Sequence, residues 1–84
     1  MLITQMANNQ IVINTKDGVY FQSYDSIVAF KGNDGKVVLG KDYRYSRTTM
    51  KYLIQFLDKD SIKEVDALVK NGTFKIDFNL SIKE

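Results

Sequence analysis

Residues 16–40 read KDGVYFQSYDSIVAFKGNDGKVVLG, and this stretch decides the fold class. Two turn sequences that contain glycine, Lys16-Asp17-Gly18 and Asn33-Asp34-Gly35, separate short runs of β-branched and aromatic residues. Glycine supplies the positive φ angle that tight hairpin turns need, so each sequence predicts a reversal between antiparallel strands. The stretch therefore predicts strands over residues 19–24, 27–31 and 36–39, joined as a meander.

The residues upstream of this stretch extend the meander. Residues 2–6 form a short apolar run, and residues 7–9 (Ala-Asn-Asn) are typical of a turn. Residues 10–15 (QIVINT) are again rich in β-branched side chains, which favour strands. The first half of the chain therefore predicts an antiparallel meander of four or five strands.

After the meander the hydrophobic spacing becomes that of helices. Ser46 is a suitable N-cap, and the apolar residues that follow it are spaced as one face of a helix that ends near Asp58. Ser61 and Glu64 form a capping box, in which the two side chains satisfy backbone N–H groups at the start of a second helix. Asn71-Gly72 predicts the end of that helix.

Residues 73–80 (TFKIDFNL) alternate between apolar and polar side chains, which predicts a final, half-buried strand. Residues 1–84 are too few for two domains, so we expect one α+β domain: an antiparallel β-meander, two short helices and a final strand. The predicted core consists of Leu53, Ile54, Leu57, Val65, Leu68, Phe74, Ile76 and Phe78.

The composition excludes several classes of chemistry. Without cysteine or histidine there is no disulfide, no thiolate metal site, no Ser-His or Cys-His catalysis, and most zinc sites are ruled out. Carboxylate pairs such as Asp58 and Asp60 are explained by the start of the second helix, which favours acidic residues. We therefore expect a protein that is not an enzyme and has no catalytic residue, metal or cofactor.

The sequence also predicts a soluble protein. No apolar run approaches the roughly 20 residues that a membrane span needs. The N-terminal residues MLITQMANNQ lack the basic and apolar regions of a signal peptide. We expect a cytoplasmic location and no contact with membranes.

Residues 41–52 (KDYRYSRTTMKY) stand out from the rest of the chain. The segment has a local charge of +3 in a chain of net charge +2, and it holds both arginines and three of the five tyrosines. Tyrosines stack on bases, and arginine and lysine neutralise phosphates or pair with carboxylates. The candidate partner-binding residues are Lys41, Tyr43, Arg44, Tyr45, Arg47 and Lys51.

Each of these residues also has a structural explanation. Tyrosine rings commonly pack on a small core with the hydroxyl in water, and Arg47 could pair with a carboxylate of its own chain. A second candidate surface is formed by Tyr20, Gln22 and Tyr24, which share one face of a predicted strand. That face is either an exposed interface or the face that the helices cover.

Two blocks of sequence resemble a small uncharacterised domain family found in phages and mobile elements of Firmicutes. They are residues 21–24 (FQSY) with 27–29 (IVA), and residues 45–49 (YSRTT) with Lys51, Phe56 and Leu57. The resemblance covers the middle of the chain. It implies a phage or plasmid context and no reaction.

These observations predict a non-enzymatic binding module of phage type. Because small phage proteins often inhibit host enzymes, we expect an inhibitor of a host nucleic-acid-handling or defence protein, similar in role to anti-CRISPR proteins, acting in the host cytoplasm. The alternative is a nucleic-acid-binding accessory protein that uses residues 41–52. An antiparallel sheet in so short a chain also leaves edge strands unpaired, which favours a homodimer, either through an edge strand or through the face of Tyr20, Gln22 and Tyr24.

Overall fold

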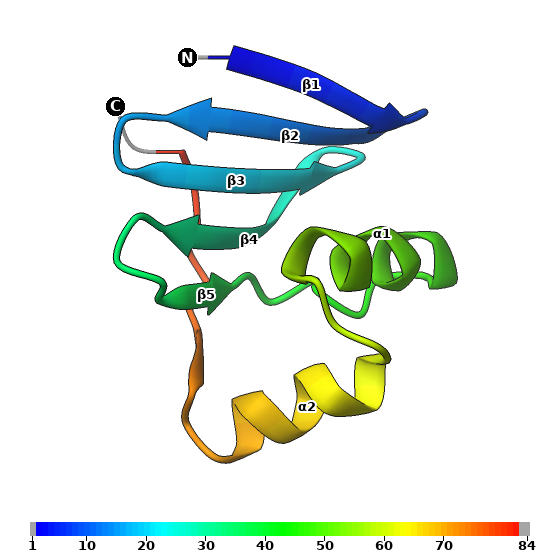
Figure 1. Cartoon of the computed structure of the whole chain (residues 1–84). Coiled ribbons are helices and arrows are strands. Elements are labelled where there is room, and N and C mark those ends of the chain that lie inside the picture. Colours follow the sequence, from blue (N-terminus) through cyan, green and yellow to red (C-terminus); the bar gives the residue numbers. More distant parts are fainter. Residues whose placement is uncertain (1, 83–84) are drawn as a thin grey trace.

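The computed structural model describes residues 2–82. These residues form six strands and two helices, which Figure 1 shows in chain order. The elements are β1 (Leu2–Ala7), β2 (Gln10–Thr15), β3 (Gly18–Ser23), β4 (Ser26–Gly32), β5 (Val37–Leu39), α1 (Arg47–Leu57), α2 (Ile62–Lys70) and β6 (Phe74–Ile76).

The described strands form one sheet in the order β1-β2-β3-β4-β5-β6. Neighbouring strands from β1 to β5 pair antiparallel, as the turn sequences predict, whereas β5 and β6 pair parallel. The parallel pair follows from the connection, because α1 and α2 lie between β5 and β6 and allow the chain to return in the same direction. The predicted α+β class and order of elements are confirmed.

The core lies between the helices and one face of the sheet. Phe21 on β3, Leu53 on α1 and Val65 on α2 are all fully buried, and the ring of Phe21 stacks on Phe56 with centroids 5.6 Å apart. Of the predicted core residues, four are buried and three are half-buried. The buried ones are Leu53, Leu57, Val65 and Phe74, and the half-buried ones are Ile54, Leu68 and Ile76.

The prediction of a strand over residues 73–80 with Phe78 in the core is wrong. The strand β6 ends at Ile76, and Phe78 is 71% exposed. The Asp77 carboxylate accepts a hydrogen bond from the Asn79 backbone N–H (2.9 Å), and the Asp77 carbonyl accepts one from Leu80 (3.2 Å). This local turn competes with the strand and redirects the chain, because aspartate readily bonds to the backbone two residues later.

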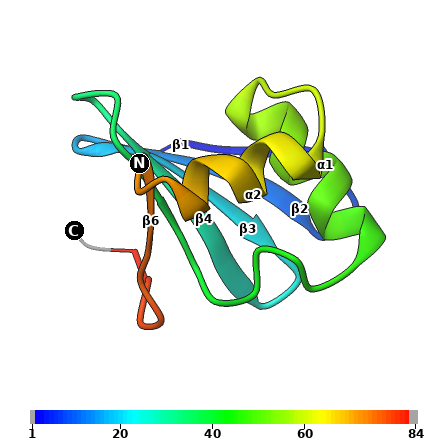
Figure 2. The same cartoon turned by 90° about the horizontal axis from the view of Figure 1, so that it is seen from below.

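After β6 the chain crosses the face of the sheet opposite the helices. Figure 1 shows this segment behind the strands, and Figure 2, turned by 90°, shows it on the other side of the sheet from α1 and α2. Tyr20 on this face is only 4% exposed, and its ring lies 4.5 Å from that of Phe30. Both faces of the central strands are therefore covered. None of the helices in residues 2–82 is long and apolar enough to cross a membrane.

Candidate partner-binding surface

The loop between β5 and α1 carries most of the predicted site residues, and side chains from distant parts of the chain fix it in place. Ser26 at the start of β4 donates a hydrogen bond to Asp42 (3.4 Å). The Tyr43 hydroxyl donates one to the carboxylate of Asp66 on α2 (2.8 Å), and Arg44 forms an ion pair with the same carboxylate (3.3 Å). The loop is thus held between the sheet and the second helix.

A chain of hydroxyl groups joins the start of α1 to the end of β3. Ser46 is the N-cap, as predicted, and its hydroxyl oxygen accepts a hydrogen bond from the Thr49 backbone N–H (3.1 Å). The Thr49 side chain is fully buried and shares a 2.8 Å hydrogen bond with the hydroxyl of Ser23. These bonds bring Tyr45, which precedes Ser46, close to Tyr24, which follows Ser23.

The rings of Tyr45 and Tyr24 lie 6.1 Å apart and are tilted by 59°. Tyr24 occupies the turn between β3 and β4 with φ at 55°, a left-handed conformation that is rare for a bulky side chain. Its backbone is held there by two hydrogen bonds, from its own N–H to the Asn9 carbonyl (2.7 Å) and from the Gln22 side chain to its carbonyl (2.9 Å). The fold thus presents an aromatic ring at a position that glycine or asparagine would occupy at lower cost.

Tyr24, Arg44, Tyr45 and Arg47 together are referred to below as the tyrosine–arginine surface. Tyr45 is 69% exposed and Tyr24 is 40% exposed. Arg47 is exposed at the first position of α1, and the Arg44 side chain is exposed although it pairs with Asp66. Tyrosine and arginine are the residue types that dominate the energetics of protein interfaces, and here two neighbouring rings occur with two exposed arginines that are one and two residues from Tyr45 in the sequence.

The other predicted site residues have different positions. Tyr43 is half-buried and packs against the core, and Lys51 lies over the ring of Tyr52 (5.3 Å to its centroid). Tyr20, Gln22 and Tyr24 do not form one exposed surface, because the C-terminal segment lies over the face that holds Tyr20 and only Tyr24 is exposed. Tyr24, which the sequence predicts to belong to the second surface, therefore lies beside Tyr45 instead.

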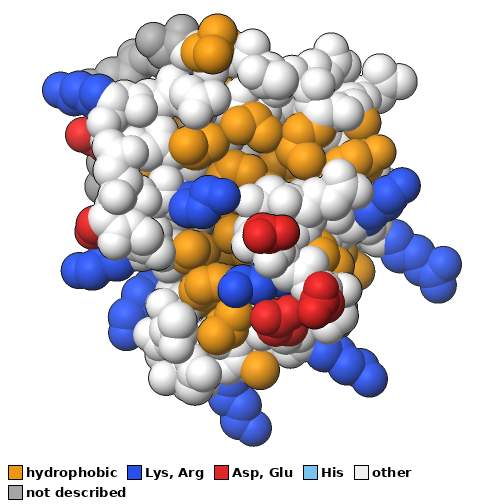
Figure 3. Space-filling model, viewed as in Figure 1, with side chains coloured by type: hydrophobic (Ala, Val, Ile, Leu, Met, Phe, Trp, Pro, Cys, Tyr) orange, Lys and Arg blue, Asp and Glu red, His pale blue; other side chains and the backbone are white. Residues whose placement is uncertain are grey.

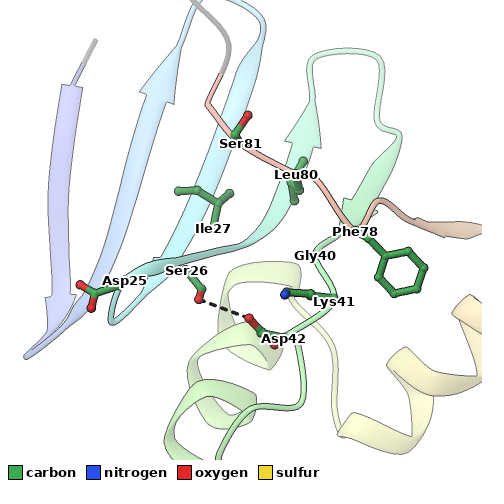
Figure 4. A pocket seen from close by; sticks show the side chains of 9 residues that line it. All are labelled: Asp25, Ser26, Ile27, Gly40, Lys41, Asp42, Phe78, Leu80 and Ser81. Atoms are coloured by element: carbon green, nitrogen blue, oxygen red, sulfur yellow. Dashed lines mark hydrogen bonds between the residues drawn. The ribbon is translucent and has the colours of Figure 1, made fainter.

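Two carboxylates from outside the basic segment, Asp25 and Asp66, add to Asp42 within it and reduce its local charge. Lys41 lies at a hollow of about 280 Å³ whose lining also includes Asp25 and Asp42, and Figure 4 shows the Ser26–Asp42 hydrogen bond beside it. Asp66 adds a third carboxylate, next to Arg44. The four basic residues of the segment therefore lie among three acidic ones, and the local excess of positive charge is smaller than the sequence predicts.

Sequence reasoning missed the part that Asp66 plays in this site. It lies on α2, more than twenty residues after the loop that it holds, and its own neighbourhood is that of an ordinary helix.

The capping box is confirmed at Ser61, whose hydroxyl oxygen accepts from the Glu64 N–H (3.3 Å). The Glu64 carboxylate, however, accepts from the N–H of Asp60 rather than from that of Ser61.

The hydrogen bond to Asp66 predicts a change of stability at alkaline pH. Burial raises the pKa of Tyr43 above its ordinary value of 10.0, and the bond to Asp66 and the negative charge of Asp66 raise it further, against the opposing charge of Arg44. Because the folded pKa is raised, this stabilisation is fully present below pH 10 and is lost as the pH rises through the folded pKa. Tyr43→Phe should lower the free energy of unfolding at neutral pH and weaken its decline above pH 10.

Urea unfolding at a series of pH values from 7 to 11, on wild type and Tyr43→Phe, measures this effect. Parallel curves for the two proteins across the alkaline range would show that the phenol of Tyr43 makes no such contribution.

No cluster of three or more histidine, cysteine, aspartate or glutamate side chains suited to a metal ion occurs among residues 2–82.

The model of DUF8033, a family of unknown function, matches residues 1–72, and the chain belongs to this family. No curated protein and no solved structure has significant similarity to the chain. The family match includes the whole tyrosine–arginine surface and ends before β6.

Proposed function

We propose that this member of the DUF8033 family is a non-enzymatic binding module that docks on a partner protein through the tyrosine–arginine surface. The observation that carries the proposal is the pair of exposed rings, Tyr24 and Tyr45, which lie 6.1 Å apart, with both arginines of the chain within two residues of Tyr45 in the sequence. Tyrosine and arginine contribute large contact areas and bidentate hydrogen bonds at interfaces. An acidic or carboxylate-bearing protein surface is the complement of this arrangement.

The local rigidity of the surface supports the same proposal. The Ser23–Thr49 hydrogen bond, the N-cap and the Asp66 contacts fix the backbone on both sides of Tyr45 before any partner arrives. A surface that is ordered in advance loses less conformational entropy on binding. The left-handed conformation of Tyr24 is a further cost to folding that a contact residue explains.

The finer proposal is that the partner is a host protein. The sequence resemblance to phage and mobile-element domains supports an inhibitor of a nucleic-acid-handling or defence protein in the host cytoplasm, comparable in role to anti-CRISPR proteins. An inhibitor that acts by occupying a surface needs no catalytic residues. A small rigid domain with one aromatic contact surface is suited to that role.

A nucleic-acid-binding accessory protein is the second candidate, and one observation favours it. Lys41, Arg47 and Lys51 are exposed, and within residues 2–82 none of them has a carboxylate at ion-pair distance. These three cations, which lack an ion-pair partner among the described residues, could contact phosphates. Asp42 within the segment and Asp25 and Asp66 near it oppose a polyanion, however, which is why we place a protein partner first.

The two functions are separated by capturing partners from a host lysate on the immobilised protein, with and without nuclease treatment. The matched control is Tyr45→Ala, which removes one ring of the surface and leaves the core untouched. A lysate protein that remains captured after nuclease treatment, and that the Tyr45→Ala variant does not capture, supports the binding module. Material that disappears with nuclease supports the second candidate, and equal capture by both proteins contradicts the proposed surface.

A further inference from the structure

The strand β1 leaves one long edge of the sheet unpaired. In the part of the sheet that the structure describes, β1 has six residues and pairs only with β2, whereas the opposite edge strand, β6, has three. An edge strand has backbone N–H and C=O groups that can pair with another strand. Proteins usually block such an edge with charge, proline, a β-bulge or a short strand.

The strand β1 has neither charge nor proline, and the irregularity in its pairing is a register shift against β2 between Gln5 and Ala7, at its C-terminal end. The strand reads LITQMA, without proline, glycine or a charged residue, and all twelve basic and ten acidic side chains of the protein follow residue 15. Figure 3, viewed as in Figure 1, shows the consequence: the upper part of the view, where β1 and β2 lie, is mostly hydrophobic or uncharged, while charged side chains lie in the middle, at the sides and below. Depletion of charge marks the centre of protein interfaces.

Exposed apolar side chains of β1 lie on both faces of the sheet, next to the exposed polar side chains of Thr4 and Gln5. Leu2 is 65% exposed and Ile3 is 62% exposed. They point to opposite faces, because Leu2 pairs with Asn14 and Ile3 with Ile13 of β2. A strand added along this edge would therefore cover apolar surface on both sides as well as complete the backbone hydrogen bonds.

We propose that β1 pairs antiparallel with β1 of a second copy of this chain, forming a continuous twelve-stranded sheet across a twofold axis. The missing charge favours a second copy over another partner, because a residue near a twofold axis meets its own copy and any charge there would be repelled. Pairing of β1 with β6 would be limited to three residues and would not close. With the axis at Thr4, Leu2 lies opposite Met6 and Ile3 opposite Gln5.

The dimer has a consequence for partner binding, although it does not depend on the proposed function. The turn after β1 contacts Tyr24 through Asn9, so the tyrosine–arginine surface lies at the end of the molecule to which β1 runs. Antiparallel pairing places the two surfaces of a dimer at opposite ends of the shared sheet. Each dimer would then bind two partners independently.

Opposite charges at Thr4 test the pairing. Thr4 is exposed, so Thr4→Lys and Thr4→Glu should fold, and circular dichroism checks this. In sedimentation equilibrium, the average mass of wild type should rise with concentration from 9.7 kDa towards twice that value. Each variant alone should stay at 9.7 kDa, and an equimolar mixture should dimerise again. The controls, Gln55→Lys and Gln55→Glu on the exposed side of α1, should dimerise as wild type does.

Amide hydrogen exchange on wild type gives a second, variant-free readout: the amides of β1 should exchange more slowly at high than at low protein concentration. If the Thr4 variants do not fold, this measurement decides alone. A wild type that remains at 9.7 kDa up to high micromolar concentration, with exchange in β1 independent of concentration, overturns the proposal. So does dimerisation of each single Thr4 variant with wild-type affinity. Neither outcome bears on capture by the tyrosine–arginine surface.

Discussion

Replacing Leu53 by alanine is expected to lower the free energy of unfolding by about 2–5 kcal/mol. Leu53 is fully buried on α1, in the cluster that joins the sheet to both helices. The substitution removes the transfer free energy of the lost methyl groups and leaves a cavity that close packing cannot fill. A small domain has a total stability of about 5–15 kcal/mol, so this change threatens folding itself.

Urea unfolding measures the loss, and Ile54→Ala is the matched control. Ile54 is the next residue on the same helix but is only half-buried, so its replacement should cost clearly less. Equal losses for the two variants would show that Leu53 is not at the centre of the core.

Replacing the exposed tyrosines is expected to weaken partner binding without weakening the fold. Tyr24→Asn and Tyr45→Ala should each lower the affinity at least about tenfold, equal to about 1.4 kcal/mol, because each removes one ring of the pair. Tyr24→Asn should also leave stability unchanged or raise it, by up to about 1 kcal/mol, because asparagine tolerates the φ angle of 55° better than tyrosine. A loss of affinity combined with a gain of stability distinguishes a contact residue from a structural one.

Isothermal titration with the captured partner and thermal unfolding of the same samples test both parts. Tyr20→Phe is the control, because Tyr20 is buried on the opposite face from the helices and should not affect affinity. A Tyr24→Asn protein that binds as wild type does, or that loses stability together with affinity, would show that Tyr24 is not a contact residue.

Local signals in the sequence predict most of the fold. The turn glycines predict the meander, and Ser46 and Ser61 predict where the helices begin, because each signal acts over a few residues. The prediction of the final strand fails because one local signal competes with another. The alternation through Phe78 is a correct local pattern, but the turn formed by the Asp77 carboxylate overrides it and exposes Phe78.

The candidate site is predictable only in part, because it is assembled by contacts between distant residues. The basic, tyrosine-rich segment is visible in the sequence, and Tyr45 and Arg47 are exposed as the hypothesis requires. Nothing in the sequence indicates that Asp66 pairs with Arg44, or that the Ser23–Thr49 hydrogen bond brings Tyr24 beside Tyr45. The alternation of Tyr20, Gln22 and Tyr24 likewise could not show that the C-terminal segment approaches Tyr20, which lines a hollow together with Leu80 and Ser81.

The most direct test of the central claim, that the tyrosine–arginine surface contacts a partner, is the affinity of the double variant Arg44→Glu with Arg47→Glu at two salt concentrations. Circular dichroism first confirms that the variant is folded, since Arg44→Glu places a second negative charge beside Asp66. We predict an affinity at least about tenfold lower than that of wild type, with a weaker salt dependence, because two charge-assisted contacts are lost. A folded variant whose affinity and salt dependence both equal those of wild type would show that the arginines face only solvent, and would contradict the account.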